Sequence, residues 1–103
     1  MATRIIALFN LKPGIDRAAY EEWARTTDLP TVNGLSSITE FTVFRSVVTL
    51  GSEAPPPYQY IEIIDVADMD QFGRDIATET MQKIAAQFQD MADVTFIMTD
   101  KLG

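Results

Sequence analysis

Three short segments of this sequence have the β-branched and aromatic character of strands but carry apolar residues at neighbouring positions. They are Ile5–Phe9, Tyr60–Ile64 and Phe96–Met98. A strand with one solvated face alternates apolar and polar residues, because successive side chains point to opposite faces. Here both faces of the predicted strands are largely apolar. Both faces of the sheet that they form must therefore be covered.

The order of the predicted elements indicates the fold class. Strands are expected at 5–9, 38–50, 58–66 and 94–99, and helical segments at 16–29 and 68–88. Asp16 is placed as a helix N-cap, Leu29 ends the first helix because it precedes a proline, and Gly73 or Thr78 breaks the second segment. The order βαββαβ predicts a ferredoxin-like α+β fold, an antiparallel sheet with both helices on one face.

The chain is expected to form a single domain spanning residues 1–103, since no repeat, linker or low-complexity segment divides it. Its helices can cover only one face of the sheet. We therefore expect a homodimer in which two sheets pack face to face across a two-fold axis. The alternative is an exposed apolar face, which soluble proteins seldom carry over several hundred Å².

Composition excludes several classes of function. The chain has no Cys and no His, so thiol nucleophiles, thiolate metal sites and histidine acid–base chemistry are ruled out. Its net charge of −7 disfavours nucleic acids and anionic membranes as partners. No phosphate-binding or nicotinamide motif is present, so neither a cofactor nor a metal is expected. Without a signal-like or membrane-spanning apolar run, we expect a cytoplasmic protein.

Glu62 is the first candidate for chemistry, because it lies in the middle of a predicted strand between Ile61 and Ile63. A carboxylate in apolar surroundings is costly unless it is paired or protonated. Glu62 is therefore either an acid or base with a raised pKa, or half of an ion pair with Arg4 or Arg45. Tyr58 and Tyr60 share its face of the strand. Each could donate a hydrogen bond to a carbonyl or oxyanion or stack on an aromatic ligand, or simply belong to the core or its rim.

Each of the remaining candidate residues has a structural interpretation beside the functional one. Asp28 could act as a base at the mouth of a cleft, or form a turn or cap. Trp23 and Tyr20 could line a pocket between helix and sheet, or belong to the core. Asn10 and Arg45 could orient a ligand, or satisfy a strand edge or an ion pair.

Three segments, Asp28–Val32, Ser37–Phe41 and Pro57–Val66, resemble the RedY-like protein HapK family of the dimeric α+β barrel superfamily. The similarity extends over essentially the whole chain. Related barrels usually place a His after the first helix. This chain has Arg25–Pro30 there, without a His, and Asp28 occupies roughly that place.

The resemblance implies a cofactor-free protein of secondary-metabolite biosynthesis, of the prodiginine, bisindole or polyketide-like kind. Such a protein would bind an aromatic or heterocyclic intermediate and promote its cyclisation or dehydration. Glu62, Tyr60 and Asp28 are the catalytic candidates, and Trp23, Tyr20, Tyr58, Asn10 and Arg45 are the ligand-binding candidates. One alternative is a non-catalytic binding or chaperone protein for an intermediate or an enzyme. Another is a cofactor-independent oxygenase, which the superfamily also contains.

Overall fold

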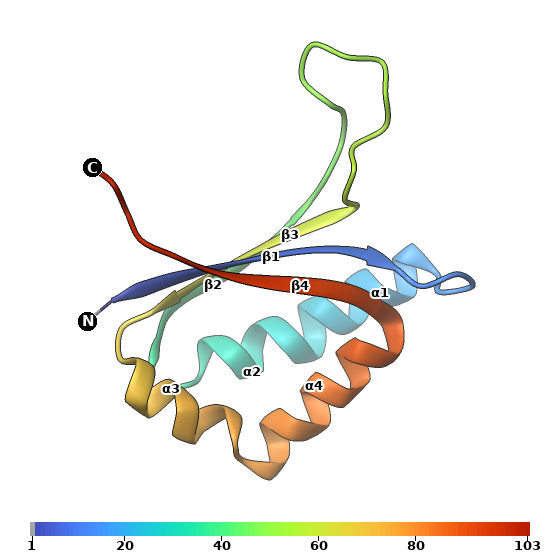
Figure 1. The fold of residues 1–103 in the computed structure, drawn as a ribbon. Helices are drawn as coiled ribbons and strands as arrows, with labels where there is room; N and C mark the ends of the chain where they lie inside the picture. The colour runs from blue at the N-terminus through green and yellow to red at the C-terminus, as the bar shows by residue number, and fades with distance from the viewer. Residues whose placement is uncertain (1) are drawn as a thin grey trace.

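Four strands form one antiparallel sheet in the order β2-β3-β1-β4 in the computed structural model, which describes residues 2–103 (Figure 1). The strands are β1 (Thr3–Leu11), β2 (Ile38–Arg45), β3 (Tyr60–Val66) and β4 (Ala92–Thr99). The helices are α1 (Arg17–Trp23), the π-helical turn η1 (Ala24–Asp28), α2 (Leu29–Asn33), α3 (Met69–Ile76) and α4 (Glu79–Met91). The predicted ferredoxin-like α+β fold is confirmed.

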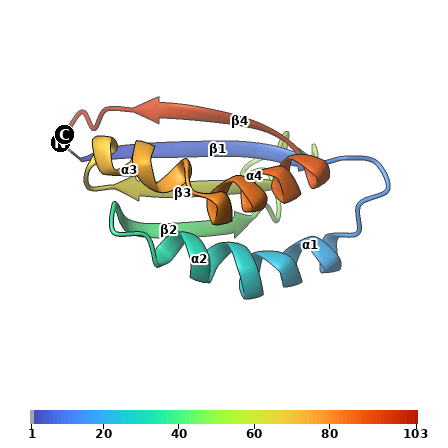
Figure 2. The same cartoon turned by 90° about the horizontal axis from the view of Figure 1, so that it is seen from below.

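All the helices lie on one face of the sheet (Figure 1). Seen from the helical side, α1 and α2 run along β2, whereas α3 and α4 lie over the middle of the sheet (Figure 2). β4 is an edge strand, and its helix-facing residues Phe96 and Met98 remain more than half exposed. An opening therefore exists between the α3–α4 pair and the β4 edge.

The first helical segment begins as predicted but ends later. The Asp16 side chain accepts a hydrogen bond from the Ala19 amide, which confirms the N-cap. The predicted end at Leu29 is wrong, because η1 widens the helix by one residue and α2 continues to Asn33. The Leu29 amide bonds to the Ala24 carbonyl, five residues back. Pro30 then stands in the first turn of α2, where a missing N–H is tolerated.

The strands around the longest loop are shorter than predicted. β2 ends at Arg45 rather than Leu50, and β3 begins at Tyr60 rather than Tyr58. The Ser46 amide still bonds to the Gln59 carbonyl, but no strand lies beside the residues that follow. Without a partner, β-branched residues do not form a strand. Residues 46–59 instead project away from the helices (Figure 1).

The other element boundaries need small corrections. The second helical segment begins after the N-cap Asp68 and breaks at Thr78, which caps α4. Gly73 lies inside α3 and does not break it. β1 and β4 are each longer than predicted, starting at Thr3 and Ala92.

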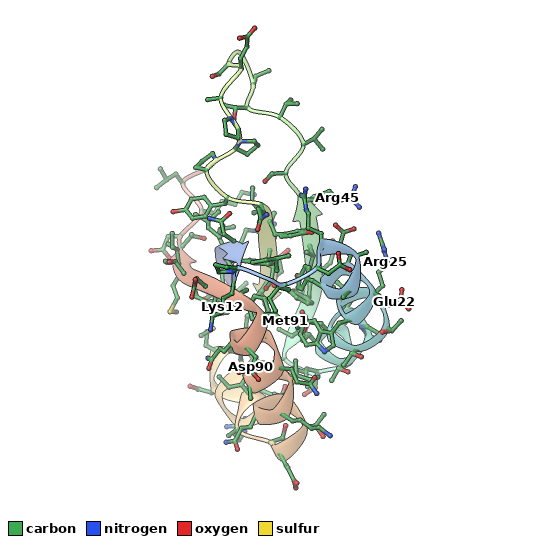
Figure 3. The ribbon with its side chains drawn as sticks, turned by 90° about the vertical axis from the view of Figure 1, so that its right-hand side faces the viewer. Lys12, Glu22, Arg25, Arg45, Asp90 and Met91 are labelled. Carbon is green, nitrogen blue, oxygen red and sulfur yellow. The ribbon has the colours of Figure 1, made fainter. Side chains whose placement is uncertain are left out.

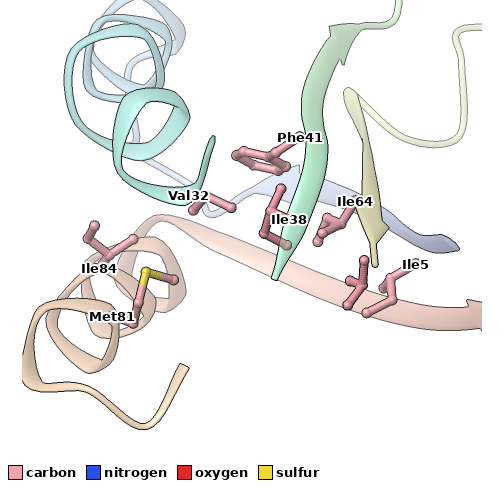
Figure 4. Close-up of a cluster of buried hydrophobic side chains, with 8 residues drawn as sticks. Ile5, Val32, Ile38, Phe41, Ile64, Met81 and Ile84 are labelled. Atoms are coloured by element: carbon pink, nitrogen blue, oxygen red, sulfur yellow. The ribbon is translucent and has the colours of Figure 1, made fainter. Parts of the chain in front are cut away.

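The core lies between the sheet and the helices. Side chains from α2 and α4 point toward side chains from β1, β2 and β3 (Figure 4). The cluster includes Ile5, Val32, Ile38, Phe41, Ile64, Val66, Met81 and Ile84. A second, aromatic cluster is centred on Phe9, Tyr20, Tyr60 and Phe88. Most of the first cluster, together with Phe88 of the second, lines the cavity described below.

The opposite face of the sheet has no helix on it. Its centre is apolar, because Ile6 pairs with Ile63 and Leu8 pairs with Ile61 across β1 and β3. Phe44 and Ile97 continue this face on the two edge strands and are about half exposed. The sequence-based observation that both faces of the sheet are apolar is therefore confirmed. We call these six residues the outer sheet face.

Candidate functional site

A cavity of about 590 Å³ lies between the sheet and the helices. This volume is in the range of small-molecule sites, roughly 300–1,000 Å³. Its walls are mostly apolar and come from β1, β2, β3, β4 and every helical segment except α1, including the π-helical turn η1. Only two lining residues carry ionisable side chains, Asp28 and Glu62. An apolar cavity with two convergent carboxyl groups is the principal candidate site.

Asp28 owes its position to the π-helical turn. It is the last residue of η1 and is only 5% exposed. No side-chain cap hydrogen bond is made by Asp28, so the interpretation as a helix cap is not the role that the geometry gives it. Turns of π-helix are often found at functional sites, because the extra residue changes which side chains face inward. Here the residue placed against the cavity is a carboxyl group.

Glu62 reaches the same cavity from the centre of the sheet. It stands opposite Ala7 of β1 and Val43 of β2, and it is 3% exposed. Its Oε1 atom is buried without a hydrogen-bond partner. The alternative of an ion pair is wrong, because Arg4 binds Asp65 and Arg45 binds Glu21.

Burial changes the acidity of both groups. Burial, and to a lesser extent the negative charge of Asp28, raises the pKa of Glu62 from the usual 4.5 to about 8. Burial also raises the pKa of Asp28 from 3.8 to about 7. The hydroxyl of Tyr20 is buried nearby without a partner, and burial followed by the charges of Glu62 and Asp28 raises its pKa. Near neutral pH Glu62 is therefore largely protonated, whereas Asp28 is close to half ionised.

Tyr60 shares a strand face with Glu62 but serves a different pocket. Its hydroxyl donates a 2.7 Å hydrogen bond to Glu21 Oε2, and its ring stacks on Phe9. Together with Tyr20, Glu21 and Arg45 it lines a smaller pocket of about 220 Å³ beside α1. Arg45 and Tyr60 hold the pKa of Glu21 well below its usual value. The ion pair of Arg45 with Glu21 forms part of the wall of this pocket, and Arg25 also lines it. Figure 3 shows Arg25 and Arg45 on the same side of the molecule.

The remaining predicted ligand-binding residues lie outside the main cavity. Trp23 packs parallel to Phe88 with 6.2 Å between ring centroids, and its Nε1 donates to Gln87. Phe88 lines the cavity, so Trp23 stands directly behind the cavity wall. Asn10 holds the long loop by hydrogen bonds to the backbone of Pro57 and Gln59. Tyr58 lies in that loop and is 38% exposed.

Sequence reasoning missed two features of the site. One is its wall of flexible and aromatic residues, which includes Met69, Phe72, Phe96 and Met98. The other is the anchor of α3: Ser37 donates two hydrogen bonds to Asp75, from its amide and from its hydroxyl. An amphipathic pattern in 69–76 is visible in the sequence, but a pairing across 38 residues is not.

The site can bind an apolar molecule and exchange protons with it. A protonated carboxyl group can donate to an oxygen, and an ionised one can accept a proton or a hydrogen bond. Within residues 2–103, no group of three or more acidic side chains could hold a metal ion. None of the helices described here is long and apolar enough to span a membrane.

Comparisons with known proteins agree with this architecture. The sequence model of the family described as REDY-like protein HapK matches residues 3–102. The crystal structure of HapK from Hahella chejuensis is 30% identical with a TM-score of 0.80, covering 100% of this chain and 94% of that one. No protein with a curated description matches significantly.

More distant structures share the fold alone. The cofactor-independent oxygenase SnoaB from Streptomyces nogalater is 16% identical with a TM-score of 0.75, and the match covers 99% of this chain and 94% of SnoaB. A dimeric ferredoxin-like protein of unknown function from Thermobifida fusca is 16% identical with a TM-score of 0.74, covering 98% and 92% of the two chains.

Proposed function

This chain belongs to the family of REDY-like HapK proteins, and we propose that it binds an aromatic or heterocyclic intermediate of secondary metabolism in the cavity between sheet and helices. The observation that carries the proposal is the pair of buried carboxyl groups, Asp28 and Glu62, in an otherwise apolar cavity of ligand size. The proposed reaction is cyclisation or loss of water, without a cofactor.

The chemistry needs only the two carboxyl groups. In a dehydration, one carboxylate removes a proton from carbon, and the other carboxyl group protonates the departing hydroxyl, which leaves as water. In a ring closure onto a carbonyl, the protonated group gives its proton to the carbonyl oxygen, while the ionised group accepts the proton that the attacking carbon or nitrogen loses. Since burial raises the pKa of Glu62 above that of Asp28, Glu62 is the acid and Asp28 the base in this proposal.

The proposed assembly is a homodimer that buries the outer sheet face. The support is the apolar centre of that face, together with the dimeric state named for the Thermobifida fusca structure. Two sheets packed in this way leave both cavities open on the outside of the dimer. The lack of Cys is consistent with the cytoplasmic location that we propose.

Turnover of candidate intermediates tests the function. Purified protein is incubated with bipyrrole, bisindole and aromatic polyketide intermediates, and products are followed by mass spectrometry for loss of water or for an isomer with altered retention. The expected result is conversion by the wild type, with a decrease of about 10²- to 10⁴-fold in Glu62→Gln. Glu22→Gln is the matched control, because Glu22 lies on the solvent side of α1 (Figure 3).

A second measurement separates catalysis from binding alone. Trp23 fluorescence reports on the cavity through Phe88, so a bound aromatic molecule should change its intensity. Binding without conversion of any compound would favour the non-catalytic protein. Consumption of oxygen with incorporation into product would favour the oxygenase. A normal rate in Glu62→Gln would contradict the assignment of Glu62.

A further inference from the structure

We propose that Asp28 and Glu62 receive the nitrogen end of an aromatic ligand that is a cation or carries an N–H donor. This inference rests on the proposed function, because it names the ligand class of the same cavity. Anionic aromatic ligands are the class that it excludes.

The ionisable groups in the cavity wall can carry charge of only one sign, which is negative. Asp28 and Glu62 supply carboxyl oxygens, and Gln82 and Gln89 are the only other strongly polar side chains in its wall. Among the residues that the structure describes, no Lys or Arg lines the cavity. An anionic ligand would therefore lose its hydration and gain no opposite charge, which is costly in an apolar site.

The arginines do not change this balance, because each of them contacts residues other than Asp28 and Glu62. Arg74, next to the lining residue Gly73 on α3, is bound to Gln71. Arg25 and Arg45 are bound to Glu21 in the smaller pocket. Arg4 is bound to Asp65 on the outer side of the sheet. The Arg17 guanidinium lies over the ring of Tyr60, 5.7 Å from its centroid.

The carboxyl oxygens, in contrast, are available to a donor. Glu62 Oε1 is buried without a partner, and neither Glu62 nor Asp28 makes a side-chain hydrogen bond within the described chain. A buried acceptor without a partner is costly, so a ligand that donates to it recovers that cost on binding. Hydrogen bonds between a nitrogen cation and a carboxylate are among the stronger ones in proteins.

The rest of the cavity fits an aromatic body. Phe72, Phe88 and Phe96 offer ring faces and edges, and Met69, Met81 and Met98 offer polarisable sulfur. The exposed pair Phe96 and Met98 lies at the β4 edge, whereas Glu62 lies on a central strand. The ligand therefore enters with its nitrogen first and leaves its apolar end toward β4.

Three probes of similar size and different charge test the inference by calorimetry. They are naphthylmethylammonium, naphthylmethanol and naphthylacetate. We expect the ammonium probe to bind about 10- to 100-fold more tightly than the acetate probe, the range for hydrogen bonds to charged groups. In the double variant Asp28→Asn with Glu62→Gln, this preference should fall to within a few-fold, while naphthylmethanol still binds.

The control is Glu22→Gln combined with Asp90→Asn, which removes the same charge from exposed positions on α1 and α4. This control variant should keep the preference for the ammonium probe over the acetate probe. The net charge of −7 attracts any cation only weakly, because solvent screens exposed charges. A preference that survives in the double cavity variant, or equal binding of all three probes, would overturn the inference but leave the proposed cavity intact. No binding of any probe would overturn both.

Discussion

Glu62 is the residue whose ionisation opposes folding most directly. Its pKa is raised from 4.5 to about 8 by burial, so the folded chain binds the proton more tightly than the unfolded chain does. The free energy of unfolding contributed by this group is therefore highest at low pH and decreases between about pH 4.5 and pH 8. The slope is at most about 1.4 kcal/mol for each pH unit. Asp28 contributes with the same sign between about pH 3.8 and pH 7.

Urea denaturation across this pH window measures the effect. Glu62→Gln cannot ionise, so its stability relative to the wild type should increase steadily as the pH rises. Subtracting the unfolding free energies of the two proteins at each pH cancels the contributions of Glu21 and Asp75. The lowered pKa values of these two groups make the free energy of unfolding decrease as the pH falls in the acid range. Parallel stability curves for Glu62→Gln and the wild type would show that Glu62 is not desolvated in the folded protein.

The substitution Tyr60→Phe should distinguish the roles of the main cavity and the smaller pocket. The substitution removes the 2.7 Å hydrogen bond to Glu21 and keeps the ring that stacks on Phe9. We expect a loss of about 1–2 kcal/mol in the free energy of unfolding, with aromatic ligands bound in the main cavity as before. Any turnover should change far less than in Glu62→Gln. A decrease as large as that of Glu62→Gln would place Tyr60 in the reacting site after all.

These three residues show how far sequence reasoning reaches at the residue scale. Because side chains alternate between the two faces of a strand, the sequence correctly predicted that Tyr60 and Glu62 share one face. The apolar neighbours of Glu62 correctly indicated that it is buried. The alternation of side chains along a strand does not show which helix residue packs over each position. The hydrogen bond between Tyr60 and Glu21 was therefore not predicted. For Asp28 the sequence leaves two interpretations open, a base at the mouth of a cleft or a turn or cap, and Pro30 predicts a helix end at Leu29. A π-helical turn has no sequence signature that would have shown its carboxyl group turned inward.

At the scale of elements, α3 is the part of the cavity wall held most weakly. None of its residues is buried, although Met69, Phe72, Gly73 and Ile76 line the cavity. Its polar anchor is Asp75, which accepts hydrogen bonds from the Ser37 amide at 3.2 Å and the Ser37 hydroxyl at 2.7 Å. Since Ser37 is fully buried, this contact fixes α3 to the start of β2.

Ser37→Ala should therefore loosen α3 specifically. It removes the hydroxyl bond and leaves the amide bond, at a cost of about 1–2 kcal/mol. Amide hydrogen exchange in residues 69–76 should become faster, while exchange in β1 and β3 stays slow. Ser36→Ala is the matched control, because Ser36 is exposed beside it. Equal acceleration over the whole chain would mean that Ser37 supports global stability and not α3.

Helix starts were predictable because their chemistry is local. Asp16, Asp68 and Thr78 each accept hydrogen bonds from amides in the first turn that follows. Strand ends were not, because a strand ends where its neighbour ends. Val47 and Val48 have strand character, yet both are more than 70% exposed in the loop, since no second strand accompanies them.

At the scale of the whole molecule, the proposed homodimer follows from the outer sheet face. Ile6, Leu8, Ile61 and Ile63 form its centre, without a helix from the same chain to cover them. A stable interface buries about 800 Å² on each partner. Light scattering at micromolar concentration should therefore give the mass of two chains. The mass of a single folded chain would contradict the dimer.

Ile63→Asp tests whether this face is the interface. It places a charge at the centre of the outer sheet face, where burial against a second copy would leave it unpaired. The variant should sediment as a monomer with unchanged helical content, whereas Ala18→Asp on the exposed side of α1 should remain a dimer. Salt should strengthen the association, because the interface is apolar and each chain carries a net charge of −7. A dimer that persists in Ile63→Asp would move the interface elsewhere on the molecule.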